Sequence, residues 1–134
     1  MDVNDEFNVG AFANFPKCTN SFVKGEKGCL LTAFAVGFGY KPESRGMTTL
    51  FKRGKQKLNT LDLEIGFNDL CRNLGIKPPK TYEDSFNFSD AVIENFDYGS
   101  PRKALNFIWK IIDKLPNKVN CVEKSAVVMP KKGE

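Results

Sequence analysis

Residues 28–40 are the most apolar part of the chain and read Gly28-Cys29-Leu30-Leu31-Thr32-Ala33-Phe34-Ala35-Val36-Gly37-Phe38-Gly39-Tyr40. Such a nearly uninterrupted apolar run predicts an element that is buried on all sides. Leucine and alanine favour a helix over a strand here, and the two later glycines would end it. We therefore expect a buried helix near residues 29–38.

Two amphipathic helices are predicted after this segment. Asn59 is a residue type that caps helix N-termini, and apolar residues then recur at helical spacing, so we expect a helix over residues 61–74. Ser100 and Pro101 suit the cap and the first position of a second helix. Its apolar face continues to Leu115, which predicts a helix over residues 101–115.

The remaining elements are short. Residues 41–46 are polar and predict a loop, whereas β-prone residues on either side of a Lys-Arg-Gly-Lys turn predict a hairpin over 47–58. Ser89 and Asp90 can cap a short helix that continues through Phe96, and the apolar run 126–129 could form a C-terminal strand.

Together these elements predict an α+β fold, a small single domain dominated by helices. A length of 134 residues and a hydrophobic fraction of 41% suit one globular domain. Residues 1–27 have little periodicity and are expected to form an irregular arm that contains phenylalanines. The globular domain would then cover 28–129, and 130–134 would be a polar tail.

Charge is separated along the chain. Residues 41–57 contain six basic residues and one acidic residue, so this segment carries +5, whereas the whole chain carries +4. Residues 81–98 contain five acidic residues and no basic residue. The protein is therefore locally polarised and only weakly basic overall.

The composition excludes several kinds of catalysis. The chain has no histidine, which removes Ser-His-Asp and Cys-His chemistry and imidazole metal sites. It also lacks a phosphate-binding glycine loop of the G-x-x-x-x-G-K-[ST] type. We expect a protein that is not an enzyme, with no catalytic residue, cofactor or metal. Two-carboxylate chemistry stays open for Glu64, Asp69, Asp90 and Glu94.

The four cysteines, Cys18, Cys29, Cys71 and Cys121, are widely spaced and form no CxxC pair. Their apolar surroundings favour reduced thiols in the core, although an even number leaves two disulfides arithmetically open. The acidic start of the chain does not fit a secretory signal, and the longest apolar run is too short to span a bilayer. We therefore expect a cytoplasmic protein without a membrane anchor.

Residues 28–35, Gly-Cys-Leu-Leu-Thr-Ala-Phe-Ala, resemble the helix that bears the nucleophile in papain-like cysteine peptidases. The resemblance covers about a dozen residues and would place Cys29 at the nucleophile's position. That family needs a histidine later in the chain, and this sequence has none. The resemblance therefore implies a catalytically inactive domain.

Our leading functional hypothesis is a non-enzymatic protein that binds another protein. It would be an accessory subunit of a larger assembly, such as a viral one, or a regulator or inhibitor. Aromatic side chains supply buried area at interfaces and nearby charges steer the approach. The candidate partner-binding residues are Phe12, Phe15, Tyr82, Phe86 and Phe88.

The alternative hypothesis is a nucleic-acid-binding module. Lysine and arginine release counterions from a phosphate backbone, so a basic segment suits such a partner. The candidate phosphate-contacting residues are Lys52, Arg53, Lys55 and Lys57.

Overall fold

The structure is a computed structural model, and it describes residues 1–18, 21–46, 48–77 and 88–120. Helices dominate, and the strands form one three-stranded and one two-stranded sheet, which confirms the α+β prediction. In chain order the described elements are β1 (Phe7–Asn8), α1 (Val9–Asn14), α2 (Leu30–Gly37), β2 (Lys41–Arg45), β3 (Thr48–Arg53), β4 (Gln56–Leu58), α3 (Thr60–Asn73), α4 (Phe88–Tyr98), α5 (Pro101–Lys114) and β5 (Lys118–Val119).

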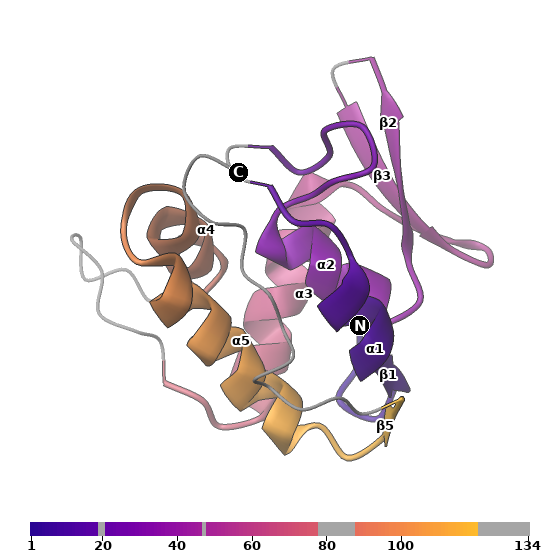
Figure 1. Cartoon of the computed structure of the whole chain (residues 1–134). Coiled ribbons are helices and arrows are strands. Elements are labelled where there is room, and N and C mark those ends of the chain that lie inside the picture. The colour runs from indigo at the N-terminus through magenta and orange to yellow at the C-terminus, as the bar shows by residue number, and fades with distance from the viewer. Residues whose placement is uncertain (19–20, 47, 78–87, 121–134) are drawn as a thin grey trace.

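Helix α2 lies at the centre of the fold, as the sequence predicts (Figure 1). It packs against the other four helices and against β2. Seven of its eight residues are buried. One of them is Gly37. This position requires glycine because a Cβ atom would overlap the ring of Phe7.

The two predicted amphipathic helices are confirmed as α3 and α5. In α3 the Asn59 side chain accepts a hydrogen bond from the Asp62 amide at 2.7 Å, and the Asp62 carboxylate accepts one from the Asn59 amide at 3.1 Å. Ser100 caps α5 by accepting a bond from the Lys103 amide at 3.3 Å. These caps satisfy amide groups that have no partner inside the helix. Helix α4 runs from Phe88 to Tyr98, so it already includes Ser89 and Asp90, which the sequence suggested as its cap, and it extends beyond Phe96.

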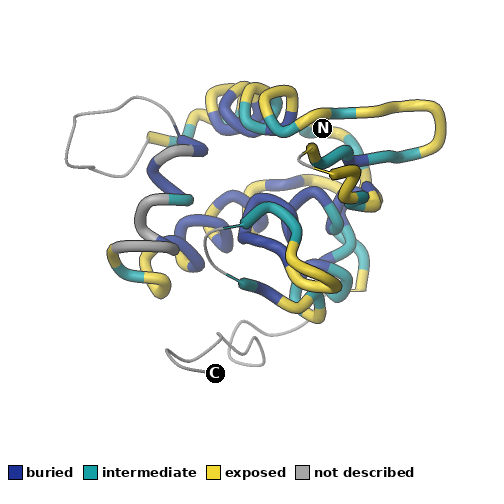
Figure 2. The backbone as a smooth tube through the Cα atoms, turned by 90° about the horizontal axis from the view of Figure 1, so that it is seen from above, coloured by how far each residue is buried: buried dark blue, intermediate teal, exposed yellow. Residues whose placement is uncertain are grey.

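The three-stranded sheet is antiparallel, in the order β2-β3-β4. The β3–β4 hairpin was predicted, but the prediction of a loop over residues 41–46 was wrong. All five residues of β2 pair with β3, from Lys41 opposite Lys52 to Arg45 opposite Thr48. The sheet projects from the helices, and Figure 2 shows exposed residues along the projecting part. Cross-strand pairing, not burial, therefore defines β2.

Part of the N-terminal arm is regular: residues 7–14 of the predicted arm form β1 and α1. Strand β1 pairs in parallel with β5, and Asn8 caps α1 by accepting a bond from the Ala11 amide at 2.8 Å. Phe7 and Phe12 are fully buried, so the arm is part of the hydrophobic core. Strand β5 supplies a strand towards the C-terminus, whereas the runs 126–129 and 130–134 lie outside the described residues.

Candidate functional site

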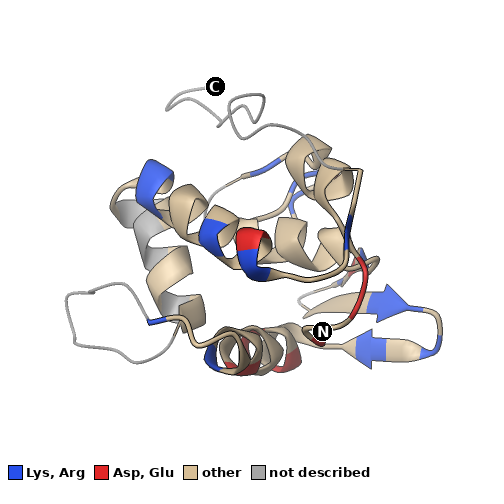
Figure 3. Ribbon diagram, turned by 90° about the horizontal axis from the view of Figure 1, so that it is seen from below, with Lys and Arg blue, Asp and Glu red and all other residues tan. Residues whose placement is uncertain are grey.

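Three lysines form one row across the outer face of the three-stranded sheet. Lys41 in β2 lies opposite Lys52 in β3, and Lys52 lies opposite Lys57 in β4. Alternation along β3 points Lys52 away from the buried side chain of Phe51 and towards solvent. Figure 3 shows the basic residues on the strands and turn of this sheet. We call Lys41, Lys52 and Lys57 the lysine row.

The charge around the lysine row is only partly neutralised. Glu43 lies on the same face, with carboxylate oxygens 2.7 Å from Lys52 Nζ and 2.9 Å from Arg45 Nε. Hydrogen bonds from Lys52 and then Arg45 lower the pKa of Glu43, which therefore stays ionised. The described residues of this face and of the β3–β4 turn carry a net charge of +4, from one acidic residue, Glu43, and five basic residues: Lys41, Arg45, Lys52, Lys55 and Lys57.

Arg53 points to the other side of the sheet, although the sequence placed it with the phosphate-contacting residues. Its guanidinium donates hydrogen bonds to the Phe38 carbonyl at 3.0 Å and to the Gln56 side chain at 2.8 Å. It also pairs with Asp5 at 3.2 Å and lies 4.5 Å from the centre of the Tyr40 ring. These contacts join the sheet to the N-terminal arm, so Lys41 replaces Arg53 in the basic surface.

The predicted partner-binding aromatics do not form one exposed surface among the described residues. Phe12 is fully buried, edge-on to Trp109 with ring centres 5.5 Å apart. Phe88 is 3% exposed and its ring stacks on that of Phe107. Phe15 is partly buried against the core. Tyr82 and Phe86 lie outside the described residues, as does most of the acidic segment.

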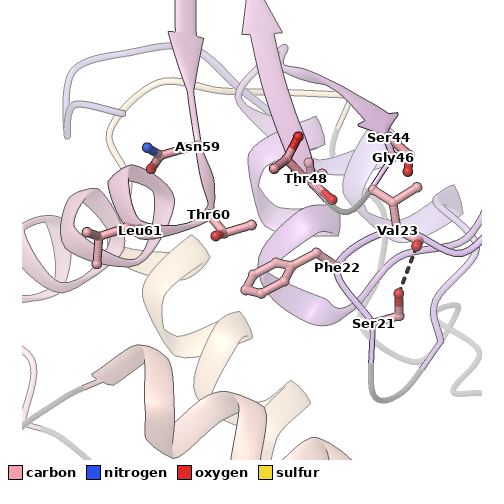
Figure 4. Close-up of a pocket in the computed structure, with 10 residues that line it drawn as sticks. Ser21, Phe22, Val23, Ser44, Gly46, Thr48, Asn59, Thr60 and Leu61 are labelled. Atoms are coloured by element: carbon pink, nitrogen blue, oxygen red, sulfur yellow. Dashed lines mark hydrogen bonds between the residues drawn. The ribbon is translucent and has the colours of Figure 1, made fainter.

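A pocket of about 640 Å³ opens between the sheet, the loop before α2 and the start of α3 (Figure 4). It is lined by Ser21, Phe22, Val23, Ser44, Gly46, Thr48, Thr49, Asn59, Thr60 and Leu61. None of these side chains is ionisable, and several carry hydroxyl groups. Among the residues that the structure describes, the lining therefore offers a ligand hydrogen bonds and an aromatic ring, but no charge.

An exposed apolar pair lies beside this pocket on α3. Leu61 is 60% exposed and Ile65 is 51% exposed, and they are the large hydrophobic residues most open to solvent in the described part of the chain. Their spacing of four places them on one face of the helix. This pair is a small apolar patch next to the pocket wall that Leu61 forms.

The cysteine that carries the peptidase resemblance lies directly before α2. Cys29 is 6% exposed, and its sulfur is 3.6 Å from the Thr32 hydroxyl oxygen. Cys71 is buried in α3, and burial raises the pKa of its thiol to about 12. Within the described ranges, no group of three or more cysteine and acidic side chains could hold a metal, and no helix could cross a membrane.

Comparisons with protein families, with curated proteins and with solved structures found no match to this chain. Any functional conclusion therefore rests on its own residues.

Proposed function

We propose that this chain is a non-enzymatic binding protein that holds a nucleic-acid backbone against the outer face of its three-stranded sheet. The observation that supports the proposal is the lysine row, which the sheet register places on an exposed surface. Like charges that face each other across strands destabilise a sheet. A polyanion on this face would relieve that repulsion, because each phosphate neutralises an ammonium group and releases counterions.

The composition of the face favours phosphate contacts over base recognition. Besides the lysine row, the outward positions of the paired strands are Glu43, Arg45, Thr48 and Leu50. No aromatic side chain occupies them, so the paired strands provide no ring for base stacking. We therefore propose sequence-independent binding, with Lys55 in the adjacent turn as a fourth contact.

Such binding has a defined salt dependence. Four phosphate contacts give a slope of about −3.6 in a plot of log affinity against log salt concentration. A rise from 50 to 200 mM salt should then weaken binding about 150-fold. The slope thus reports how many cations touch phosphate.

The test measures fluorescence anisotropy of a labelled mixed-sequence DNA duplex at several salt concentrations. Substitution of the lysine row by glutamine (Lys41→Gln, Lys52→Gln, Lys57→Gln) should reduce the slope to about −1. A matched control removes three exposed cations from the outer face of α5 (Arg102→Gln, Lys103→Gln, Lys110→Gln). Because both triple variants change the net charge equally, they separate a local site from overall charge.

The control should keep the wild-type slope. An equal reduction of the slope in the two triple variants would mean that the overall charge of the protein attracts DNA. The outer face would then not be a binding site. Absence of salt-dependent binding by the wild-type protein would contradict the proposal itself. Single-stranded DNA and RNA of the same length would show which form of nucleic acid is preferred.

A protein partner is the second candidate, and the exposed pair Leu61 and Ile65 is the observation that favours it. Such a partner would make this chain an accessory subunit or a regulator of another protein. Apolar contacts resist salt, unlike phosphate contacts. A protein retained in a pull-down at high salt after nuclease treatment, and lost on Leu61→Ser with Ile65→Ser, would support this candidate. If the double variant still retained the same protein, the patch formed by Leu61 and Ile65 would be excluded as its binding site.

A further inference from the structure

The loop before α2 is closed at its base by a short parallel pairing. Lys17 forms a β-bridge with Gly28. The Cys18 amide donates to the Gly28 carbonyl at 2.8 Å, and the Gly28 amide donates to the Pro16 carbonyl at 3.1 Å. These two bonds fix the register of the two chain segments at the neck of the loop.

The register places one cysteine directly after each of the two bridging residues. Cys18 follows Lys17 and Cys29 follows Gly28, so in a parallel pair the two cysteines are the next residues to face each other. Paired strands lie about 4.8 Å apart. Disulfides need Cα atoms about 4.4–6.8 Å apart, and the spacing typical of a bridged pair such as Lys17 and Gly28 falls within this range.

Residues 21–23, which lie between these cysteines, form one wall of the pocket. They are Ser21, Phe22 and Val23, and the far end of the loop is held by a second bridge between Lys24 and Lys27. The Phe22 carbonyl accepts a hydrogen bond from the Thr32 hydroxyl at 2.7 Å, which attaches the loop to α2. A covalent link at the neck would therefore restrict the part of the chain that shapes the pocket.

We propose that Cys18 and Cys29 form a reversible disulfide that closes the pocket loop. The sequence alone favours reduced thiols for all four cysteines, whereas the register singles out this pair. With oxidised glutathione as the oxidant, the Cys18 thiolate attacks one glutathione sulfur and releases one reduced glutathione. The Cys29 thiolate then attacks the Cys18 sulfur of this mixed disulfide and releases the second. Two thiols lose their protons and two electrons pass to glutathione.

Burial sets the order of these two steps. Cys18 is partly exposed, whereas Cys29 is 6% exposed, so an external disulfide reaches Cys18 first. Cys29 lies directly before α2 and directly after the bridging residue Gly28. Cys29 is thus placed to complete the exchange within the molecule.

The experiment incubates the folded protein with oxidised glutathione and identifies linked cysteines by peptide mapping after blocking of remaining thiols. We expect a Cys18–Cys29 link, reversal by dithiothreitol, and an unfolding midpoint about 10 °C higher in the oxidised protein. Cys18→Ser should prevent loop closure. Cys29→Ser should stop the reaction at the mixed disulfide on Cys18. Cys71→Ala, in α3, should leave the link intact.

Three results would overturn the proposal: a stable mixed disulfide on wild-type Cys18, a link from either cysteine to Cys71 or Cys121, or no reaction of the folded protein. Mapping of the wild-type protein gives the answer even if the Cys29→Ser variant fails to fold. Hydrogen exchange provides a second readout, because closure should slow amide exchange over residues 21–28 and leave α5 unchanged.

Discussion

A buried lysine holds the end of α1, and its replacement gives the sharpest test of how the N-terminal arm is stabilised. Lys17 is 7% exposed, and its ammonium donates to the carbonyls of Phe12 at 2.9 Å, Phe15 at 3.0 Å and Ala13 at 3.3 Å. It also lies 4.8 Å from the centre of the Phe12 ring. Lys17→Met keeps much of the apolar stem but removes all three donors.

Two opposing contributions to the free energy of unfolding set the size of the change. A hydrogen bond from a charged donor contributes about 1.5–3 kcal/mol, and the Phe12 carbonyl is the acceptor in the fully buried contact. Water can reach the other two carbonyls, because their contacts are only partly buried. Loss of the ammonium also removes the penalty for burying its charge. We therefore expect Lys17→Met to lower the free energy of unfolding by about 2 kcal/mol at pH 7.

The effect should depend on pH in a defined direction. Burial lowers the pKa of Lys17 from 10.5 to about 8, so between these pH values the unfolded chain binds more protons than the folded one. The stability contributed by this group therefore rises as pH increases from 8 to 10.5, by up to about 3 kcal/mol. The difference between wild type and Lys17→Met should widen over this range.

Denaturant unfolding from pH 7 to 10 measures both effects, with the fluorescence of Trp109 as the probe. Trp109 is 5% exposed and packs edge-on against Phe12, so it reports directly on the packing of α1. Lys24→Met is the matched control, because Lys24 is exposed and should change stability by less than about 0.5 kcal/mol. Equal stabilities of the two variants at every pH would refute this account of Lys17.

Three further substitutions test the packing and the caps, each by denaturant unfolding. Gly37→Ala should cost about 2 kcal/mol because its methyl group meets the Phe7 ring. Gly66→Ala in α3 should stabilise the protein, because its methyl group would only touch the flexible end of the Met1 side chain, and equal effects of the two substitutions would contradict the close approach at Gly37. Asn59→Ala should cost about 1 kcal/mol by removing one half of the α3 capping box, and an unchanged midpoint would count against that cap. Arg53→Lys should lower the free energy of unfolding by about 1–2 kcal/mol, because an ammonium cannot donate to both the Phe38 carbonyl and the Gln56 side chain as the guanidinium does. A variant as stable as wild type would show that these hydrogen bonds contribute little.

Local signals account for the helices that the sequence predicted. Asn59 and Ser100 mark the starts of α3 and α5 because their side chains accept amide bonds within the first turn. The apolar stripe of each helix then identifies the buried face. Helix α2 was predicted for a different reason, since a segment with almost no polar residues has to be buried on all sides.

Non-local contacts explain the elements that the sequence missed. Strand β2 contains Pro42 among charged residues, and it becomes a strand only because β3 pairs with every one of its residues. Helix α1 has six residues, too few to be stable alone, and depends on Asn8 at its start and Lys17 at its end. No periodic pattern within either segment predicts the pairing with β3 or the contacts of Asn8 and Lys17.

The candidate site illustrates the same limit at the level of single side chains. The sequence showed that residues 41–57 are basic, but a shift of one residue in the pairing would move every side chain to the other face. The register places Lys41 beside Lys52 and Lys57, and it turns Arg53 towards the N-terminal arm. Three facing lysines weaken the sheet, and Glu43 contacts only Lys52 among them. The glutamine variants should therefore be at least as stable as wild type while they bind DNA less tightly, the signature of a surface whose charge serves a partner and not the fold.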